Sequence, residues 1–551
     1  MTRQRTTKKL EFPIKGINEG TSYERQPAGT CADALNMRSF DSVSGRMSGG
    51  VRAGVQKYAP TQPNGEQRIQ DLNHAVLFRS EAPEQASLSL RAIVPLVVSG
   101  GIIKRFDRNG YTAVVGAGSV GSEALSPTAP VIFSARFYDD VFYVDGVKAV
   151  YFDTDAQAGA GEVKTWTPDA GSLFPADGTN LPRLICTWNG RIVLAGISSD
   201  PHNWFMSAMD SPTDFNYGAT PTETIAVAGN TGGAAKVADK INTLIPYTDD
   251  LLLFGCDHSI WRMTGDPMSG GRLDLVSDVT GMAWGKPWCM GPSGEVYFFG
   301  SRGGLFRMLP ASMGQGVAPE RISALRIERR MKGLNLNTTL VRLVWNDEEM
   351  GVNVFLNSLT GDSREHLFWD SRADAWWSDR FQNKDIAPVA VHVLDGDDPA
   401  DRAVLLGSED GYVRHTVADS ALDDEDNINS YVVLGPIVDK ANRQFVINEI
   451  SAEFSEDSSD VNYAITTGIT AGVAVTGSDA VLAGVLMCSG EEFRLTVEAS
   501  VASGILEAPA SYYKYPKARA YRAYVKLSNT ARWSLEWVML EIDAIVSKAK
   551  R

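Results

Sequence analysis

The strongest constraint on the fold is a repeated unit of short apolar runs, each followed by a glycine-containing turn. The clearest copies are Leu251–Met263 and Val296–Met308, in which a buried run, Gly and four turn residues precede an apolar-aromatic-Arg-Met run. The turn glycines of the recognisable copies are Gly100, Gly146, Gly196, Gly255, Gly300 and Gly407. With one further copy near residue 355 that lacks the glycine, the spacing is about 50 residues, which is the period of propeller blades.

This repeat predicts an all-β protein built around a β-propeller of about six to eight blades. Almost no stretch long enough for a helix lies between the apolar runs, which excludes an alternating α/β fold. Each blade is expected to be a four-stranded antiparallel sheet, and runs such as 251–254 are expected to form the inner strands near the axis. The propeller is predicted over residues 61–425.

Two other regions flank the predicted propeller. Residues 1–60 are rich in Gly, Ser, Arg and Pro with weak periodicity, which predicts an extended arm that docks elsewhere. After the acidic segment Asp423–Asp426, residues 426–551 alternate polar and apolar residues and predict a C-terminal β-sandwich-like domain. One inserted amphipathic helix is predicted over Pro319–Leu334, with Gly333 as its C-cap.

Composition narrows the functional class. The 551 residues carry a net charge of −15, which weighs against a nucleic-acid-binding protein, because such binding depends on Lys and Arg neutralising phosphates. The five cysteines are far apart and form no CxxC pair, which predicts free thiols rather than a disulfide framework or a zinc site. The N-terminus lacks a signal-peptide h-region, and no run of apolar residues is long enough for a membrane span.

The sequence offers few residues for catalysis. Val114–Glu123 contains GxGxxG, but the prolines of Ser126–Pro130 interrupt the helix that a dinucleotide site requires, so a blade turn is the preferred interpretation. The six histidines have no metal-ligand spacing, and the acidic clusters Asp395–Asp398 and Asp423–Asp426 do not match a calcium-binding loop. We therefore predict no catalytic residue, no cofactor and no metal, and no enzyme activity.

Two sets of segments carry a family resemblance. The first resembles the opening of the tail nozzle proteins of short-tailed bacteriophages and consists of Gly16–Gly20, Pro27–Met37, Arg46 and Val51–Tyr58. The second resembles the packaged-DNA stabilisation (tail tubular) proteins of the same phages and consists of Leu181–Arg191, Trp204–Met206, Pro212–Phe215, Ile241–Ile245, Phe254–Gly265, Gly281–Trp288 and Pro319–Ser323.

The resemblance implies a structural virion protein, made in the host cytoplasm, that forms a ring, expected to be a hexamer, in the phage tail. Such a ring lies below the portal and its adaptor, extends the DNA channel, helps to retain packaged DNA and carries a tail fibre, spike or needle protein. DNA would pass through without sequence-specific binding. Two alternatives remain open: a secreted or surface propeller that binds or hydrolyses glycans, and a cytosolic propeller scaffold for peptide partners.

Two groups of residues are candidate contacts in the nozzle interpretation. The candidate assembly contacts of the arm are Pro27, Asn36, Arg46, Arg52, Lys57 and Tyr58. The predicted helix is basic, and its candidate channel or interface residues are Arg321, Arg326, Arg329 and Arg330. A solvated helix face is the alternative for the second group. Removal of residues 1–58 is expected to prevent incorporation into tails and to leave a folded propeller.

Overall fold

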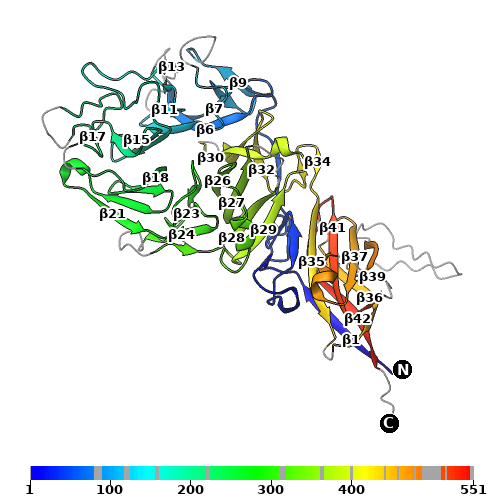
Figure 1. The fold of residues 1–551 in the computed structure, drawn as a ribbon. Coiled ribbons are helices and arrows are strands. Elements are labelled where there is room, and N and C mark those ends of the chain that lie inside the picture. The colour runs from blue at the N-terminus through cyan, green and yellow to red at the C-terminus, as the bar shows by residue number, and fades with distance from the viewer. Residues whose placement is uncertain are drawn as a thin grey trace.

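The fold was taken from a computed structural model (Figure 1). The structure describes residues 2–79, 90–116, 124–155, 161–218, 224–231, 234–310, 318–359, 365–396, 401–439, 442–455, 458–476, 480–486, 511–514 and 518–546. These residues form an elongated molecule in which a large propeller lies beside a smaller sandwich (Figure 1). The predicted all-β class is confirmed.

Seven antiparallel sheets in the described residues form the propeller blades. Blade 1 consists of β6 (Ile69–Arg79), β7 (Leu90–Ser99), β8 (Ile102–Asp107) and β9 (Gly110–Ala113). Blade 2 consists of β10 (Phe133–Phe137), β11 (Asp140–Val144), β12 (Ala149–Asp153) and β13 (Glu162–Thr165). Blade 3 consists of β14 (Leu184–Trp188), β15 (Arg191–Ile197), β16 (Asp200–Met206) and β17 (Val227–Ala228). Blade 4 consists of β18 (Ile241–Thr248), β19 (Leu251–Cys256), β20 (Ile260–Thr264) and β21 (Arg272–Ser277).

The remaining blades follow the same order. Blade 5 consists of β22 (Trp288–Met290), β23 (Val296–Phe299), β24 (Leu305–Met308) and β25 (Glu320–Arg321). Blade 6 consists of β26 (Thr339–Asn346), β27 (Gly351–Ser358), β28 (Glu365–Asp370) and β29 (Ala375–Arg380). Blade 7 contains β30 (Pro388–Asp395), β31 (Arg402–Ser408) and β32 (Val413–Val417), and β5 (Gly54–Lys57) is its fourth strand. A short hairpin of β33 (Leu422–Asp423) and β34 (Asp426–Asn427) extends the same sheet.

The sequence repeat marks the second strand of each blade, not the inner strand. The inner strand of blade 4 is β18, and Leu251–Phe254 belongs to β19, so the inner-strand interpretation of that run is wrong. The second strand lies inside the blade with neighbouring blades on both faces, which explains its unbroken apolar sequence. The glycines permit close blade packing: a Cβ at Gly407 of β31 would lie 2.5 Å from Ile69 of blade 1.

Blade 7 is closed by a strand from the N-terminal segment. β32 pairs antiparallel with β5, with Thr416 opposite Val55, and β5 also pairs with β33 through Val55 and Asp423. The inner strand β30 of blade 7 contacts the inner strand β6 of blade 1, which joins the last blade to the first. The ring is thus held shut by residues at the two ends of the propeller sequence, and no blade is left without its outer strand.

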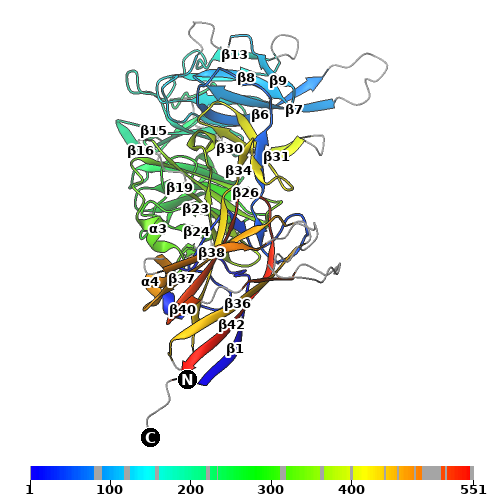
Figure 2. The same ribbon diagram turned by 90° about the vertical axis from the view of Figure 1, so that its right-hand side faces the viewer.

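The C-terminal domain is a sandwich of two sheets. One sheet contains β1 (Thr2–Glu11), β42 (Leu535–Val546), β36 (Phe445–Phe454) and β39 (Ser511–Lys514), and β40 (Ala518–Ala520) also pairs with β36. The other contains β2 (Asp33–Leu35), β35 (Ser430–Val438), β41 (Arg522–Asn529), β37 (Val461–Gly468) and β38 (Ala480–Leu486). Figure 2 shows β1 beside β42, so the first and last strands of the chain are neighbours.

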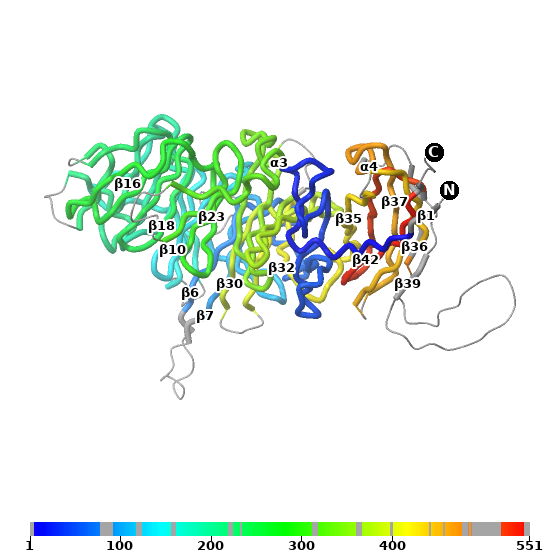
Figure 3. The backbone as a smooth tube through the Cα atoms, turned by 90° about the horizontal axis from the view of Figure 1, so that it is seen from below, coloured from blue at the N-terminus to red at the C-terminus, as the bar shows by residue number. Residues whose placement is uncertain are grey.

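The N-terminal segment over residues 1–60 is extended, as predicted, and it is shared between both domains of the same chain. β1 and β2 complete the two sandwich sheets, and β5 completes blade 7. In Figure 3 the dark blue N-terminal segment runs between propeller and sandwich. Removing residues 1–58 would therefore delete β1, β2 and β5 together with the short paired strands β3 (Met37–Arg38) and β4 (Gly50–Val51), and the truncated chain would lack the strand that closes the propeller.

One apolar core crosses the junction between the domains. It includes Phe12 and Ile17 of the N-terminal segment, Trp376 and Trp377 of blade 6, and Trp533 before β42, all of them buried. The Phe12 and Trp377 rings stack with their centroids 5.7 Å apart. Because the same cluster contains side chains from the propeller, the sandwich and the segment between them, the domains form one packed unit.

The inserted helix is shorter than predicted. α3 spans only Glu328–Lys332, and residues 322–327 form turns in which Leu325 has a φ of 61°. Ile327 and Met331 are buried. A second short helix, α4 (Ala471–Thr476), lies against β37 and β41 and was not predicted.

The acidic segment Asp423–Asp426 is not a solvated linker, because part of it is buried in ion pairs. Asp423 is 1% exposed and accepts hydrogen bonds from Arg52 Nη1 at 2.9 Å and Nη2 at 2.5 Å. Asp424 is bound by Arg414 through a 2.8 Å hydrogen bond. The Arg52–Asp423 pair fixes β5 next to β33 at the closure of blade 7.

We predict that Arg52→Gln lowers the free energy of unfolding by about 3–5 kcal/mol, because Asp423 would be left as a buried charge without its partner. Lys236→Gln is the control, since Lys236 and Asp200 form a pair that is more than a third exposed, and its loss should cost at most about 1 kcal/mol. Urea unfolding followed by tryptophan fluorescence measures both. Equal effects of the two substitutions would contradict the stabilising role of the Arg52–Asp423 pair.

Candidate functional sites: a groove at the domain junction and a pocket on the propeller axis

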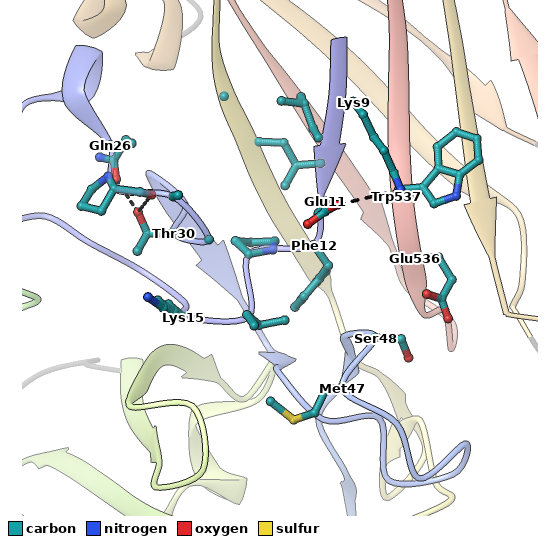
Figure 4. A pocket seen from close by; sticks show the side chains of 18 of the residues that line it. Lys9, Glu11, Phe12, Lys15, Gln26, Thr30, Met47, Ser48, Glu536 and Trp537 are labelled. Atoms are coloured by element: carbon teal, nitrogen blue, oxygen red, sulfur yellow. Dashed lines mark hydrogen bonds and ion pairs between the residues drawn. The ribbon is translucent and has the colours of Figure 1, made fainter.

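A groove of about 810 Å³ lies where the N-terminal segment meets the sandwich. Lys9 and Trp537 lie on one side, and Gln26 and Thr30 lie on the other (Figure 4). Its lining is about equally polar and apolar. The apolar residues include Phe12, Pro13, Ile14, Pro27, Met47, Leu434, Pro436 and Trp537, and the charged residues are Lys9, Glu11, Lys15 and Glu536. Such a surface can take an extended apolar segment flanked by charges of either sign.

The predicted assembly residues separate into buried and exposed groups. Pro27 is exposed and lines the groove, and Arg46 and Lys57 are exposed elsewhere on the segment. For these three a contact with another subunit stays a prediction. The other three do not present a surface, because Asn36, Arg52 and Tyr58 are buried.

The buried three hold the N-terminal segment on the rest of the chain. Asn36 donates to the carbonyl oxygens of Arg380 at 3.1 Å and Asn429 at 2.6 Å, and its own oxygen accepts from Arg52 at 3.1 Å. Tyr58 donates to Asp401 at 3.1 Å. Their role in this structure is internal, which corrects their assignment as assembly contacts.

The basic residues near α3 are mostly engaged within the chain. Arg326 donates to the carbonyl oxygen of Lys15 at 3.2 Å, and Arg330 bonds Glu19 and Ser378, so both hold residues 15–19 against the propeller. Arg321 pairs with Glu328 at 3.1 Å. Arg329 is exposed. These contacts give Arg321, Arg326 and Arg330 a structural role within the chain, and their assignment to a channel or an interface stays a prediction.

A second pocket, of about 260 Å³, lies at the inner strands of blades 1 to 5. Its polar lining comes from five blades and consists of Asp71 and Asn73 on β6, Ser134 and Arg136 on β10, Thr187 on β14, Thr243 on β18, and Lys286 before β22. Inner strands surround the propeller axis, so we call it the axial pocket. Sequence reasoning missed it, because its members are separated by whole blades.

One carboxylate faces several cations in the axial pocket. Asp71 accepts a hydrogen bond from Ser134, which in turn accepts one from Asn73 at 2.8 Å. Burial raises the pKa of Asp71 to about 6, and the Ser134 hydrogen bond and the charges of Lys286 and Arg342 oppose that rise. Burial lowers the pKa of Lys286 and that of Arg342, the latter to about 10. Of these two cations, Arg342 is buried and Lys286 is exposed.

Two histidines meet beside the pocket. His74 of β6 and His392 of β30 are joined by a 2.8 Å hydrogen bond between His74 Nδ1 and His392 Nε2. Arg136 Nη1 lies 2.8 Å from His74 Nε2 and can only donate, so His74 Nε2 accepts and Nδ1 carries the proton that it donates to His392. Burial, together with Arg136 and Lys286, lowers the pKa of His74 to about 4. Burial and the neighbouring groups His74, Lys286 and Arg136 likewise lower the pKa of His392.

The other sequence candidates give little further chemistry. The GxGxxG motif lies largely outside the described residues, and so does the second half of the acidic cluster Asp395–Asp398. Among described residues, no group of three His, Cys, Asp or Glu side chains could hold a metal ion, and no helix is long and apolar enough to cross a membrane. Cys31, Cys186, Cys256 and Cys289 are buried free thiols, and burial raises the pKa of each.

We predict that the histidine pair reduces stability as the pH falls. The folded-state pKa of His74 is below its unfolded value, so the unfolded chain binds more protons between about pH 6.5 and 4, and acidification favours unfolding. On acidification the histidine pair should lower the free energy of unfolding by on the order of 1–3 kcal/mol. The double variant His74→Gln/His392→Gln should not show this loss. Asp71 acts in the opposite direction, so the quantity to measure is the difference between wild type and variant in urea midpoints at pH 7 and pH 4.5.

The exposed His202 gives the matched control. His202→Gln should leave the wild-type pH dependence unchanged. If the double variant keeps the same pH dependence as wild type, the neutral hydrogen-bonded pair is not the cause of the loss of stability at low pH.

No family model matches the sequence, and no curated protein matches it. The extracellular domain of a putative hybrid two-component system from Bacteroides thetaiotaomicron is similar at 6% identity, over 79% of this chain and 48% of that chain, with a TM-score of 0.42. This chain spans about half the length of that structure.

Two smaller solved structures are matched over nearly their whole length. A catalytically inactive virginiamycin B lyase from Staphylococcus aureus with quinupristin is similar at 10% identity, over 66% of this chain and 98% of that chain, with a TM-score of 0.39. The N-terminal domain of Nup159 is similar at 10% identity over 66% and 95% of the two chains, with a TM-score of 0.36. At these values the likeness concerns the propeller architecture alone.

Proposed function

We propose that this protein is a structural subunit of a short-tailed bacteriophage tail, in which copies of the chain form the nozzle ring below the portal and adaptor. The observation that carries the proposal is the place of the residues that resemble the nozzle proteins. They lie in the N-terminal segment that completes blade 7 and both sandwich sheets. A resemblance at such positions supports the proposal that the two share a way of joining two domains.

Individual positions of that segment have strict requirements. Gly16 has a φ of 66°, and a Cβ there would lie 2.3 Å from the carbonyl oxygen of Trp376, so a side chain would collide with blade 6. Asn36 has a φ of 54° and is fully buried with both ends of its amide bonded. These requirements account for the motif without catalysis or ligand binding.

A rigid subunit suits the proposed mechanical role. The propeller has its blades closed in a ring, and a continuous core joins it to the sandwich, so a load on one domain is carried to the other. The net charge of −15 disfavours adhesion of passing DNA. The partners under this proposal are other copies of the chain, the adaptor, and a fibre, spike or needle protein.

The groove is the proposed contact between neighbouring copies. Ile14 is 37% exposed and Met47 is 40% exposed, so two large apolar side chains on its wall face solvent in a single chain. A second copy of the chain is the occupant that ring formation requires, and its apolar side chains would cover this wall.

We predict that purified protein mixed with portal and adaptor forms rings that cap the adaptor and have an axial hole wide enough for duplex DNA, visible by electron microscopy. The double variant Ile14→Asp/Met47→Asp should stay folded and fail to form rings, because charges would replace the apolar wall. Val279→Asp is the matched control, since Val279 is 78% exposed on blade 4 and its substitution should leave rings intact. A folded wild-type protein that stays monomeric with the adaptor would contradict the proposal.

The second candidate is a secreted or surface propeller that binds glycans, and the polar axial pocket is the observation that favours it. Propeller ligands commonly bind near the axis, where inner strands from several blades present polar groups together. Glycan binding by a monomer that ignores the adaptor would support this candidate over the nozzle.

A further inference from the structure

The axial pocket concentrates positive charge in an acidic protein. Arg136 and Lys286 line it from blades 2 and 5, and Arg342 of β26 interacts electrostatically with Lys286 at its side. Asp71 is the carboxylate that interacts with both Lys286 and Arg342. These three cations and one carboxylate leave an excess of positive charge around the axial pocket, although the whole chain has a net charge of −15.

Arg342 is buried, Arg136 and Lys286 are exposed, and all three differ from the cations that the chain buries in ion pairs. Arg52, Arg191 and Arg414 are nearly inaccessible, and each forms an ion pair with an aspartate at 2.5–2.8 Å. Within the described part of the chain, Arg136, Lys286 and Arg342 form no ion pair with a carboxylate within 4.0 Å. The one hydrogen bond of the Arg342 side chain goes from Nε to the Val389 carbonyl oxygen at 3.3 Å, and that of Arg136 goes to His74.

A buried hydroxyl in the same pocket has no partner. Thr243 of β18 is 1% exposed and lines the pocket, and its Oγ1 makes no hydrogen bond. A buried hydroxyl without a partner costs free energy that a bound acceptor would recover. The unpaired cations and this donor therefore both point to a ligand that is negatively charged and accepts hydrogen bonds.

We propose that the axial pocket binds a tetrahedral oxyanion, either free phosphate or sulfate or a small ligand that ends in such a group. Lys286 and Arg136 supply charge, Thr243 donates a hydrogen bond, and Arg342 adds positive potential from beside the site. Asp71 opposes the anion and is held in place by Ser134. This site is separate from the ring contact, so it does not depend on the proposed tail function.

Sulfate is the probe for the first test, because its charge is constant near neutral pH. Titration calorimetry of the full chain at constant ionic strength should show one sulfate site, with chloride giving no comparable heat. Lys286→Met and Thr243→Val should each weaken sulfate binding, the former by about tenfold or more. Lys236→Gln, which removes an exposed lysine distant from the pocket, should leave the affinity unchanged.

Asp71→Asn gives an effect of the opposite sign. Removing the opposing charge should tighten sulfate binding several-fold, which a merely destabilised protein would not show. Sulfate affinity that is the same in wild type, Lys286→Met and Asp71→Asn would identify an adventitious ion only and overturn the proposal. No sulfate binding by folded wild-type protein would overturn it as well. Phosphate tested in the same way distinguishes a site for either oxyanion from one that prefers sulfate.

The pH dependence of sulfate binding tests the part played by Asp71. The polar groups that face it are Ser134 on β10, Tyr143 on β11, Lys286 before β22 and Arg342 on β26. With a pKa of about 6, Asp71 loses its charge as the pH falls from 7 to 5.5, so sulfate should bind more tightly at the lower pH. His74, whose pKa is about 4, stays neutral over this range. The increase should disappear in Asp71→Asn, and its persistence there would contradict the role of this carboxylate.

Discussion

The structure depends on the pairing of β5 with β32, because this pairing supplies the outer strand of blade 7 and fixes the N-terminal segment on the propeller. The buried Arg52–Asp423 pair holds the same strand on its other side. From this point the segment continues back through β2 and β1 into the sandwich. One stretch of about sixty residues thereby makes two domains into one packed unit, and neither domain is complete without it.

The sequence predicted the propeller well because each blade is a local unit. A buried second strand, a glycine and a following strand recur within one blade, and such patterns need no knowledge of distant residues. Blade number fell within the expected range, and the sandwich was visible from polar–apolar alternation. The repeat could not say which strand of a blade lies innermost, since a strand covered on both faces by neighbouring blades is as apolar as a strand at the axis.

The internal partners of the N-terminal segment and the residues of the axial pocket were missed because they are distant from one another in sequence. Asn36 contacts Arg380 and Asn429, and His74 contacts His392, so pairs of residues more than 300 positions apart determine both features. β2 and β5 are three and four residues long, too short for a periodic pattern. Arg330 was correctly noted as part of a basic group, but only the structure places Glu19 against it.

Residues 2–57 are an integral part of the folded chain before any partner binds. Hydrogen exchange of the isolated protein, followed by mass spectrometry, tests this most directly. The account predicts that amides of β1, β2 and β5 exchange as slowly as those of their partners β42, β35 and β32, because their backbone groups lie in the same sheets. Rapid exchange throughout residues 2–57, with slow exchange in the blades, would show a detached arm and contradict the account.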